Sequence, residues 1–170
     1  MITSYEPATA ADRADVAAQL GRPPRGMLAV AARCPSGHPA VVLTSPRLPD
    51  GTPFPTLYYL TCPRLCSLAS RLEAEGVMRE MTGRLASDPE LAAAYRSAHE
   101  IYLTERDALD PLGTDVTAGG MPARVKCLHA LLAHTLAAGP GVNPLGDETL
   151  ALVSERWPDG DCTRGRNVNG

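Results

Sequence analysis

Short apolar runs separated by turn residues fill the first third of the chain. The runs cover residues 27–33, 40–44 and 56–61. Valine, tyrosine and threonine, which favour strands, are frequent in the second and third runs. The connections between the runs are rich in proline, glycine, serine and aspartate, which are typical of turns. The pattern therefore predicts a small antiparallel sheet of about three strands.

Beyond residue 62 the apolar residues follow helical spacing instead. Together with a short segment near the N-terminus, this spacing predicts helices over residues 10–20, 65–85, 91–109, 121–138 and 144–156. Gly76 interrupts the second of these, which is therefore one kinked helix or two. Met121-Pro122 is expected to open the fourth helix directly after Gly119-Gly120. A sheet near the front with four or more helices behind it defines an α+β fold class.

Length and composition fit one domain. The chain has 170 residues, of which 44% are hydrophobic, and this is enough for a full core. We therefore expect a single α+β domain over residues 1–157. Residues 158–170 are polar and carry no hydrophobic pattern, so we expect them to form a disordered tail.

The charge of the chain excludes several classes of partner. The formal net charge is −3 and the isoelectric point is about 5.8, so there is no polybasic surface for nucleic acid or for an anionic membrane. No apolar run approaches the ~20 residues that cross a bilayer, and the N-terminus lacks a signal-peptide pattern. We expect a soluble, cytoplasmic protein. Its five cysteines are then free thiols, metal ligands or reactive groups rather than disulfides.

Three cysteines occupy the ends of predicted elements. Cys34 and Cys62 each end a strand and precede a proline, and Cys127 lies near the start of a helix. If their strands pair, Cys34 and Cys62 converge, because paired strands lie only ~5 Å apart. Three thiolates with an imidazole or a water suit zinc, and three thiolates also suit an iron–sulfur cluster with one open iron. The alternative is that all are small buried side chains, as we expect for Cys66.

The segment around Cys127 carries the other candidate groups. Lys126 is the only lysine beside fifteen arginines. An ammonium next to a cysteine favours the thiolate. Chance in an arginine-rich composition explains the single lysine equally well. Arg124 and Lys126 fall in the first turns of the predicted helix, where they and the backbone N–H groups would bind a small anionic ligand. His129 and His134 are candidates for a fourth metal ligand or a proton-transfer group, but in a regular helix His129 points away from Cys127.

The segment Gly-Val-Asn-Pro-Leu-Gly-Asp joins the last two predicted helices. Asn143 has a side chain that suits an N-cap, and Pro144 suits the first position of a helix. This structural role explains the segment without a ligand. The alternative is that Asn143 contacts a cofactor.

Four segments together resemble a known family. They read Arg-Cys-Pro-Ser-Gly-His-Pro, Gly-Thr-Pro-Phe-Pro-Thr-Leu-Tyr-Tyr-Leu-Thr-Cys-Pro, Arg-Leu-Glu-Ala-Glu-Gly and Val-Lys-Cys-Leu-His-Ala-Leu-Leu-Ala-His. The family is the uncharacterised bacterial domain-of-unknown-function family numbered 501, and the resemblance extends over residues 10–155. It brings no established activity. It implies that the signature segments contain Cys34, Cys62, Cys127, His129, His134 and the turn at 143–146, whereas Cys66 and Cys162 fall outside them.

Three functional hypotheses follow. The first is a protein that binds a metal ion or an iron–sulfur cluster through Cys34, Cys62 and Cys127, and that is an enzyme only if the metal keeps an open position. The second is a non-enzymatic interaction module that uses the helices at 65–109, with the cysteines as core residues. The third is a thiol-dependent enzyme that uses Cys127 with His129 or His134. Substrate, metal and partner stay open.

Overall fold

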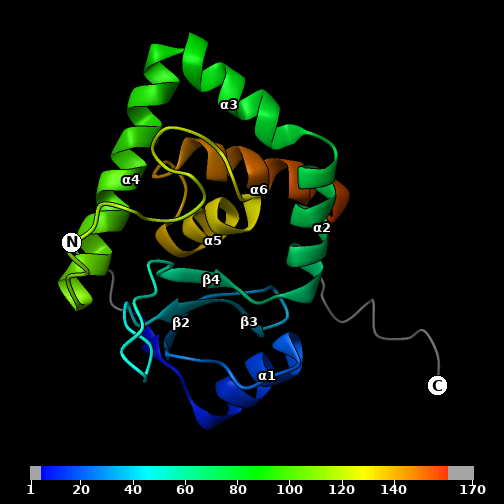
Figure 1. Cartoon of the computed structure of the whole chain (residues 1–170). Coiled ribbons are helices and arrows are strands. Elements are labelled where there is room, and N and C mark those ends of the chain that lie inside the picture. The colour runs from blue at the N-terminus through cyan, green and yellow to red at the C-terminus, as the bar shows by residue number, and fades with distance from the viewer. Residues whose placement is uncertain (1–4, 161–170) are drawn as a thin grey trace.

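The computed structural model describes residues 5–160, which form an α+β fold of one four-stranded sheet and six helices (Figure 1). The predicted fold class is confirmed. Most of the predicted tail, from residue 161 onward, lies outside the described residues.

The sheet is antiparallel throughout, with the strands in chain order. Its members are β1 (Glu6–Pro7), β2 (Met27–Arg33), β3 (Pro39–Thr44) and β4 (Tyr58–Leu60). The predicted meander corresponds to β2, β3 and β4. The additional strand β1 has two residues, which is too short for a hydrophobic period to reveal it.

The helices largely follow the predicted ranges. They are α1 (Ala10–Leu20), α2 (Pro63–Ala74), α3 (Val77–Ser87), α4 (Pro89–Leu109), α5 (Leu128–Ala138) and α6 (Pro144–Arg156). The stretch at 65–85 is two helices, because Gly76 takes a left-handed conformation with φ 88° between them. Asp88 starts α4 by accepting hydrogen bonds from the backbone N–H groups of Glu90 and Leu91.

The predicted start of the helix at Met121-Pro122 is wrong, because α5 begins only at Leu128. Gly119 and Gly120 have φ of 69° and 92°, which turn the chain into a compact loop. The loop closes when Lys126 N donates to the carbonyl of Gly119 at 2.7 Å. A Cβ at Gly120 would lie 2.7 Å from the carbonyl oxygen of Arg124, so the close return of the chain requires glycine there.

The sheet has helices on both faces (Figure 1). On one face, Val16 of α1 packs against Met27, Val30 and Val42. On the other face, α5 lies against β4 and is enclosed further by α2 and α6. Residues 128–135 of α5 belong mostly to the core, so the helix is apolar around most of its circumference. The start of α5 is therefore held in place from several sides.

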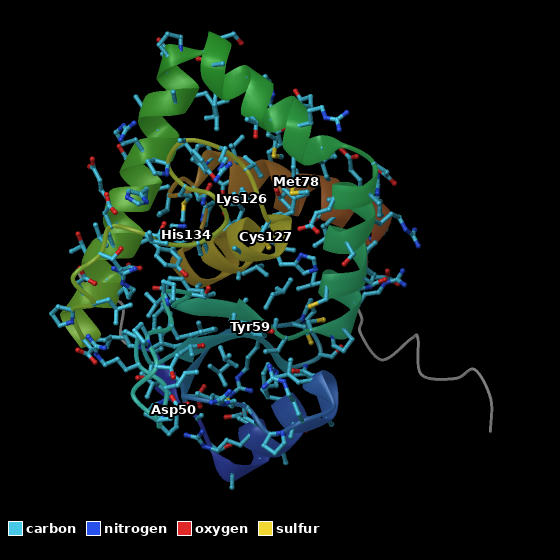
Figure 2. The ribbon with its side chains drawn as sticks, viewed as in Figure 1. Asp50, Tyr59, Met78, Lys126, Cys127 and His134 are labelled. Atoms are coloured by element: carbon cyan, nitrogen blue, oxygen red, sulfur yellow. The ribbon has the colours of Figure 1, made fainter. Side chains whose placement is uncertain are left out.

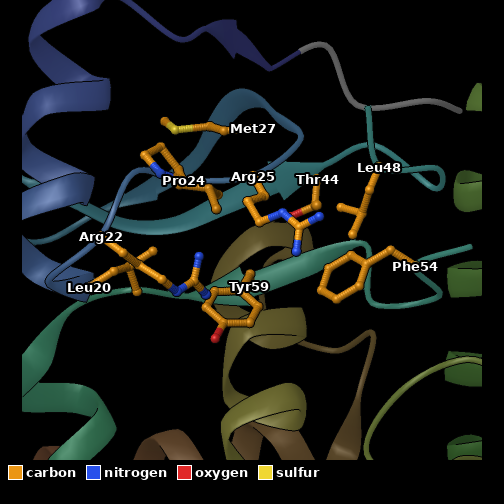
Figure 3. A pocket seen from close by; sticks show the side chains of 10 residues that line it. Leu20, Arg22, Pro24, Arg25, Met27, Thr44, Leu48, Phe54 and Tyr59 are labelled. Atoms are coloured by element: carbon orange, nitrogen blue, oxygen red, sulfur yellow. The ribbon is translucent and has the colours of Figure 1, made fainter. Parts of the chain in front are cut away.

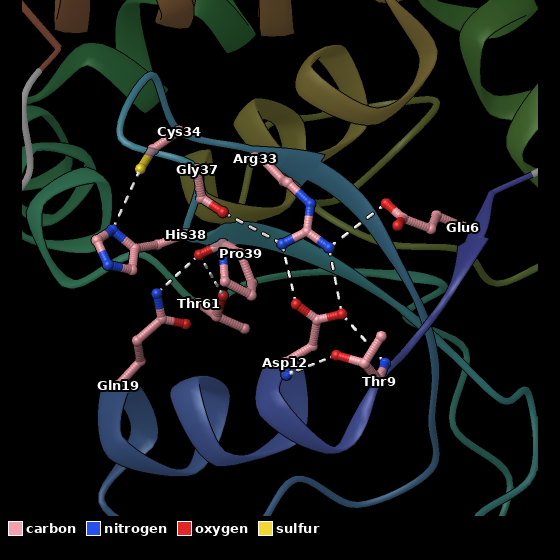
Figure 4. A network of polar contacts seen from close by, with 10 residues as sticks. All are labelled: Glu6, Thr9, Asp12, Gln19, Arg33, Cys34, Gly37, His38, Pro39 and Thr61. Atoms are coloured by element: carbon pink, nitrogen blue, oxygen red, sulfur yellow. Dashed lines mark hydrogen bonds and ion pairs between the residues drawn. The ribbon is translucent and has the colours of Figure 1, made fainter.

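An ion pair between the buried Asp12 and the partly exposed Arg33 attaches α1 to the sheet (Figure 4). Asp12 has a side chain that is only 7% exposed, and its two carboxylate oxygens accept from the two Nη atoms of Arg33 at 2.9 and 3.2 Å. Asp12 also forms a capping box with Thr9 at the start of α1. The hydrogen bond with Arg33 lowers the pKa of Asp12 to about 2.

A glycine permits α6 to approach α5 closely. A Cβ at Gly146 would lie 2.2 Å from Thr135 Oγ1 and 2.5 Å from the carbonyl oxygen of Leu131. Asn143 caps α6 by accepting from Gly146 N at 3.0 Å, and Pro144 occupies the first helical position. The structural role predicted for this turn is therefore confirmed.

Candidate functional site

Cys127 precedes α5 as its N-cap and has an extended backbone with φ −153° and ψ 112°. The sequence predicted that Cys127 and His129 point to opposite sides, on the assumption that both lie in a regular helix. The prediction is wrong because Cys127 precedes the helix and is extended. The extended residue allows the thiol to turn toward the imidazole of the first helical turn. Cys127 and His129 therefore lie together.

Glu73, on α2, joins these two residues. Its Oε1 accepts from Leu128 N at 2.8 Å and lies 3.0 Å from Nδ1 of His129. The first contact satisfies an N–H group at the start of α5 that has no partner within the helix. Since Cys127 has no side-chain capping bond, Glu73 supplies from another helix what an N-cap side chain ordinarily supplies.

The ligand atoms of Glu73, Cys127 and His129 all lie within 4.8 Å of one another. We call these three residues the Glu73 cluster. Within residues 5–160 it is the one group of three or more His, Cys, Asp or Glu side chains with ligand atoms this close. The side chains of His129 and Glu73 are 28% and 23% exposed, so the cluster is anchored in the core and open to water on one side.

His129 carries a positive charge at neutral pH. Its hydrogen bond with Cys127, and next the bond and charge of Glu73, raise its pKa to about 9 against the opposing effect of burial. Its Nε2 lies 3.1 Å from the carbonyl oxygen of Cys66 and 3.2 Å from Ser70 Oγ. With both ring nitrogens protonated, Nδ1 donates to Glu73 and Nε2 donates to Cys66.

Pairwise electrostatic interactions connect three other cysteines, Cys34, Cys62 and Cys66, to Cys127 of this cluster. Cys66 interacts electrostatically with both Cys127 and Cys62, and Cys62 with Cys34. Burial is the main cause that raises the pKa of Cys66, to about 11, and that of Cys62. At neutral pH both are therefore protonated thiols in the metal-free protein.

Cys34 and Cys62 do not approach each other through direct pairing of the two strands that they follow. Their strands β2 and β4 are separated by β3. The β2–β3 turn brings Cys34 back beside the start of β3, where Cys34 N donates to the carbonyl of His38. The end of β4 reaches the same place, since Cys62 N donates to Ala40. Cys34 Sγ also lies 3.9 Å from Nδ1 of His38 (Figure 4).

His134 lies away from the Glu73 cluster, further along α5 (Figure 2). It is fully buried, stacked on Tyr58 with ring centroids 5.8 Å apart and against the edge of Tyr102 at 5.0 Å. Burial lowers its pKa to about 4, so the ring is neutral at pH 7. Its Nδ1 lies 3.1 Å from Nδ2 of Asn143, which donates because Asn143 Oδ1 already accepts from Gly146.

The prediction that Arg124 and Lys126 lie in the first turns of a helix is wrong, because α5 begins at Leu128. The anion site was expected on the basis of that geometry. Both precede Cys127, and both are exposed. The carbonyl of Arg124 accepts from the hydroxyl of Tyr95 at 3.0 Å, and Lys126 N closes the loop onto Gly119. Their backbones therefore hold the loop in place, whereas their side chains reach solvent.

Glu73 is the member of the cluster that sequence reasoning missed. It lies in Arg-Leu-Glu-Ala-Glu-Gly, within the second predicted helix. The only feature of the sequence that indicates a role for Glu73 is that this segment is one of the four that carry the family resemblance. A carboxylate on a helix otherwise has the sequence pattern of an ordinary surface residue.

Fold and site together define an α+β domain that brings a thiol, an imidazole and a carboxylate from two helices to one point. The family model described as "Protein of unknown function (DUF501)" matches residues 30–151, and the chain belongs to this family. The match contains all three residues of the Glu73 cluster. No curated protein matches the chain, and no solved structure does. None of the helices within residues 5–160 has the length and apolar character needed to cross a membrane.

Proposed function

We propose that this protein binds a divalent transition-metal ion through Cys127, His129 and Glu73, with zinc as the first candidate. The observation that supports the proposal is the mutual distance of at most 4.8 Å among the three ligand atoms. Thiolate sulfur, imidazole nitrogen and carboxylate oxygen are the donor types that zinc accepts. Three protein ligands leave a fourth position for water or substrate, as in catalytic zinc sites.

The charges of the Glu73 cluster also suit a cation. In the metal-free protein the protonated His129 is the positive charge between Glu73 and Cys127. A metal ion would replace a proton of the imidazole, so binding releases protons and strengthens as pH rises. The ion would also hold together α2 and α5, because Glu73 belongs to α2 and Cys127 is the N-cap of α5.

A three-cysteine site with zinc or an iron–sulfur cluster is the alternative assignment of the metal. It would use Cys34, Cys62 and Cys127. The electrostatic neighbours described above, from Cys34 through Cys62 and Cys66 to Cys127, favour it. We prefer the Glu73 cluster because its ligand atoms already lie close together. A cytoplasmic location, in which thiols stay reduced, is part of either proposal.

Metal analysis of the anaerobically purified protein tests the proposal. We expect about one equivalent of zinc and a colourless protein. Cys127→Ser, His129→Gln and Glu73→Gln each reduce the metal content, whereas Cys34→Ser and Cys62→Ser retain it. Visible absorption that is lost in Cys34→Ser would instead establish the iron–sulfur assignment. A metal content unchanged in all three cluster variants contradicts our proposal.

A thiol-dependent reaction is the second candidate, and the contact between Glu73 and His129 favours it. A carboxylate that orients an imidazole beside a thiol is the arrangement that activates a nucleophilic cysteine. Alkylation of the metal-free protein by iodoacetamide at pH 7 tests this. Cys127 should react faster than Cys66, whose raised pKa keeps it protonated. Equal, slow alkylation of both thiols would rule out this candidate.

A further inference from the structure

A cavity of about 360 Å³ lies on the outer face of the sheet, beside the end of α1 (Figure 3). Helix α1 ends at Leu20 and covers only part of this face. The remaining part is bordered by the turn at 22–25 and by the loop that carries Leu48 and Phe54. The volume falls within the range of roughly 300–1,000 Å³ that is typical of small-molecule sites.

The floor and one wall of the cavity are apolar and aromatic. Met27, Val42 and Tyr59 contribute side chains from three neighbouring strands. Phe54 faces Tyr59, with ring centroids 6.4 Å apart and ring planes inclined by 41°. Two inclined aromatic faces at the edge of an apolar floor suit a flat apolar ligand.

The opposite wall is positively charged. Arg22 and Arg25 lie on the turn after α1, and Figure 3 shows their side chains extending toward Tyr59 and Phe54. No aspartate or glutamate is among the residues that line the cavity. Two guanidinium groups therefore line this wall in a chain whose net charge is −3, and the acid that pairs with Arg25, Asp50, lies outside the lining.

The present contacts of the two arginines are weak and replaceable. Arg25 pairs with Asp50 at 3.3 Å, but the two side chains are 59% and 57% exposed, and such exposed pairs contribute little. Arg22 donates to the carbonyl of the adjacent Pro23 at 3.4 Å, which is long for a hydrogen bond. A carboxylate offers both guanidinium groups a better partner.

We propose that this cavity binds a small amphipathic monoanion, with a flat apolar body and one carboxylate. The body lies on the floor against Tyr59 and Phe54, and the carboxylate accepts hydrogen bonds from Arg22 and Arg25. None of these residues belongs to the Glu73 cluster, so the proposal is independent of metal binding.

Binding of 2-naphthoate to the full chain tests the proposal, with 2-naphthalenemethanol as the neutral probe of equal shape. The titration is followed by ¹H–¹⁵N spectra, in which the amides of the non-proline residues within 22–27 and 54–60 should shift. The double variant Arg22→Gln/Arg25→Gln should weaken naphthoate about tenfold or more, because it removes charge-assisted hydrogen bonds. It should leave the weaker binding of the alcohol nearly unchanged.

Matched variants separate charge from shape. Arg79→Gln removes an exposed arginine of α3 outside the cavity and should leave both affinities unchanged. Asp50→Asn should tighten naphthoate, because it frees Arg25, and Phe54→Ala should weaken both probes. Absence of shifts in these amides at millimolar naphthoate overturns the proposal. The proposal is also overturned if the wild type binds naphthoate and the alcohol with equal affinity and the double variant leaves both affinities unchanged.

Discussion

Glu73 and His129 are separated by 56 residues in the sequence, and their side chains meet with Oε1 3.0 Å from Nδ1. The same carboxylate oxygen accepts from Leu128 N, at the start of α5. One side chain of α2 therefore fixes both the beginning of α5 and the orientation of its first histidine. Cys127 adjoins both groups because it is the N-cap of that helix. This shared carboxylate is the structural basis of the proposed metal site.

Glu73→Gln should lower the pKa of His129 from about 9 toward its ordinary value of 6.5, because it removes a negative charge beside the ring. The decrease should be partial, since Cys127 contributes more to the shift than Glu73 does. The fold should persist, because the amide oxygen of glutamine still accepts from Leu128 N. NMR titration of the His129 ring protons in the metal-free protein measures the change.

Glu75→Gln is the matched control for that experiment. Glu75 is the C-cap residue of α2 and pairs with Arg156 at 2.6 Å, away from His129. Its removal should leave the titration of His129 as it is in the wild type. Equal titration curves for His129 in the wild type and in Glu73→Gln would show that the carboxylate does not act on this ring.

Gly146→Ala should destabilise the protein by about 3 kcal/mol, because the added methyl group overlaps Thr135 and Leu131 where α5 and α6 meet. Gly83→Ala is the control. Gly83 is also helical, but nothing lies within 4 Å of its Cβ position, so alanine there should stabilise the protein by up to about 1 kcal/mol. Urea unfolding of the three proteins measures both effects. Equal stability of the two variants would contradict the close approach of α6 to α5.

The buried His134 should make the protein sensitive to mild acid. Its pKa is about 4 in the folded state and about 6.5 when unfolded, so the unfolded chain binds more protons between these values. The stability that the neutral His134 contributes should therefore be fully present above pH 6.5 and should fall by about 3 kcal/mol as the pH decreases to 4. Urea unfolding at pH 7 and at pH 4.5 measures the loss.

His134→Gln separates this residue from the other titrating groups. The variant should be less stable than the wild type at pH 7, because glutamine does not fill the space between Tyr58 and Tyr102. Its stability should nevertheless vary less between pH 7 and 4.5. Asp12 does not interfere, since its lowered pKa of about 2 removes stability only as the pH falls below about 4. A pH dependence equal to that of the wild type would show that His134 is not the titrating group.

The ion pair of Asp12 and Arg33 should contribute a coupling energy of about 1–2 kcal/mol, because the carboxylate is buried but Arg33 is one-third exposed. Urea unfolding of Asp12→Asn, Arg33→Gln and the double variant gives this energy as the non-additive part. Asparagine can still accept from Thr9 N in the capping box, so the cycle reports on the pair rather than on the cap. Additive effects would show that the pair holds α1 in place without stabilising the fold.

The sequence predicted the fold class and most of the elements, because these depend on local periodicity and on capping residues. Gly76, which interrupts the predicted helix at 65–85, marked a real helix boundary. The start of α5 was wrong because a local pattern does not reveal that Lys126 N bonds back to Gly119. That error also concealed the approach of Cys127 to His129, since a helical Cys127 would point elsewhere. Glu73 could not be found locally at all, because its partners lie on a helix more than fifty residues away.

Titration of the metal-free protein with cobalt(II) tests the central claim most directly, because a cobalt–thiolate bond absorbs in the near ultraviolet. The wild type should show this absorption and saturate at about one equivalent. Cys127→Ser should abolish the absorption, whereas Cys34→Ser and Cys62→Ser should retain it. Saturation of the wild type without thiolate absorption, or an unchanged spectrum in Cys127→Ser, would contradict metal binding by the Glu73 cluster.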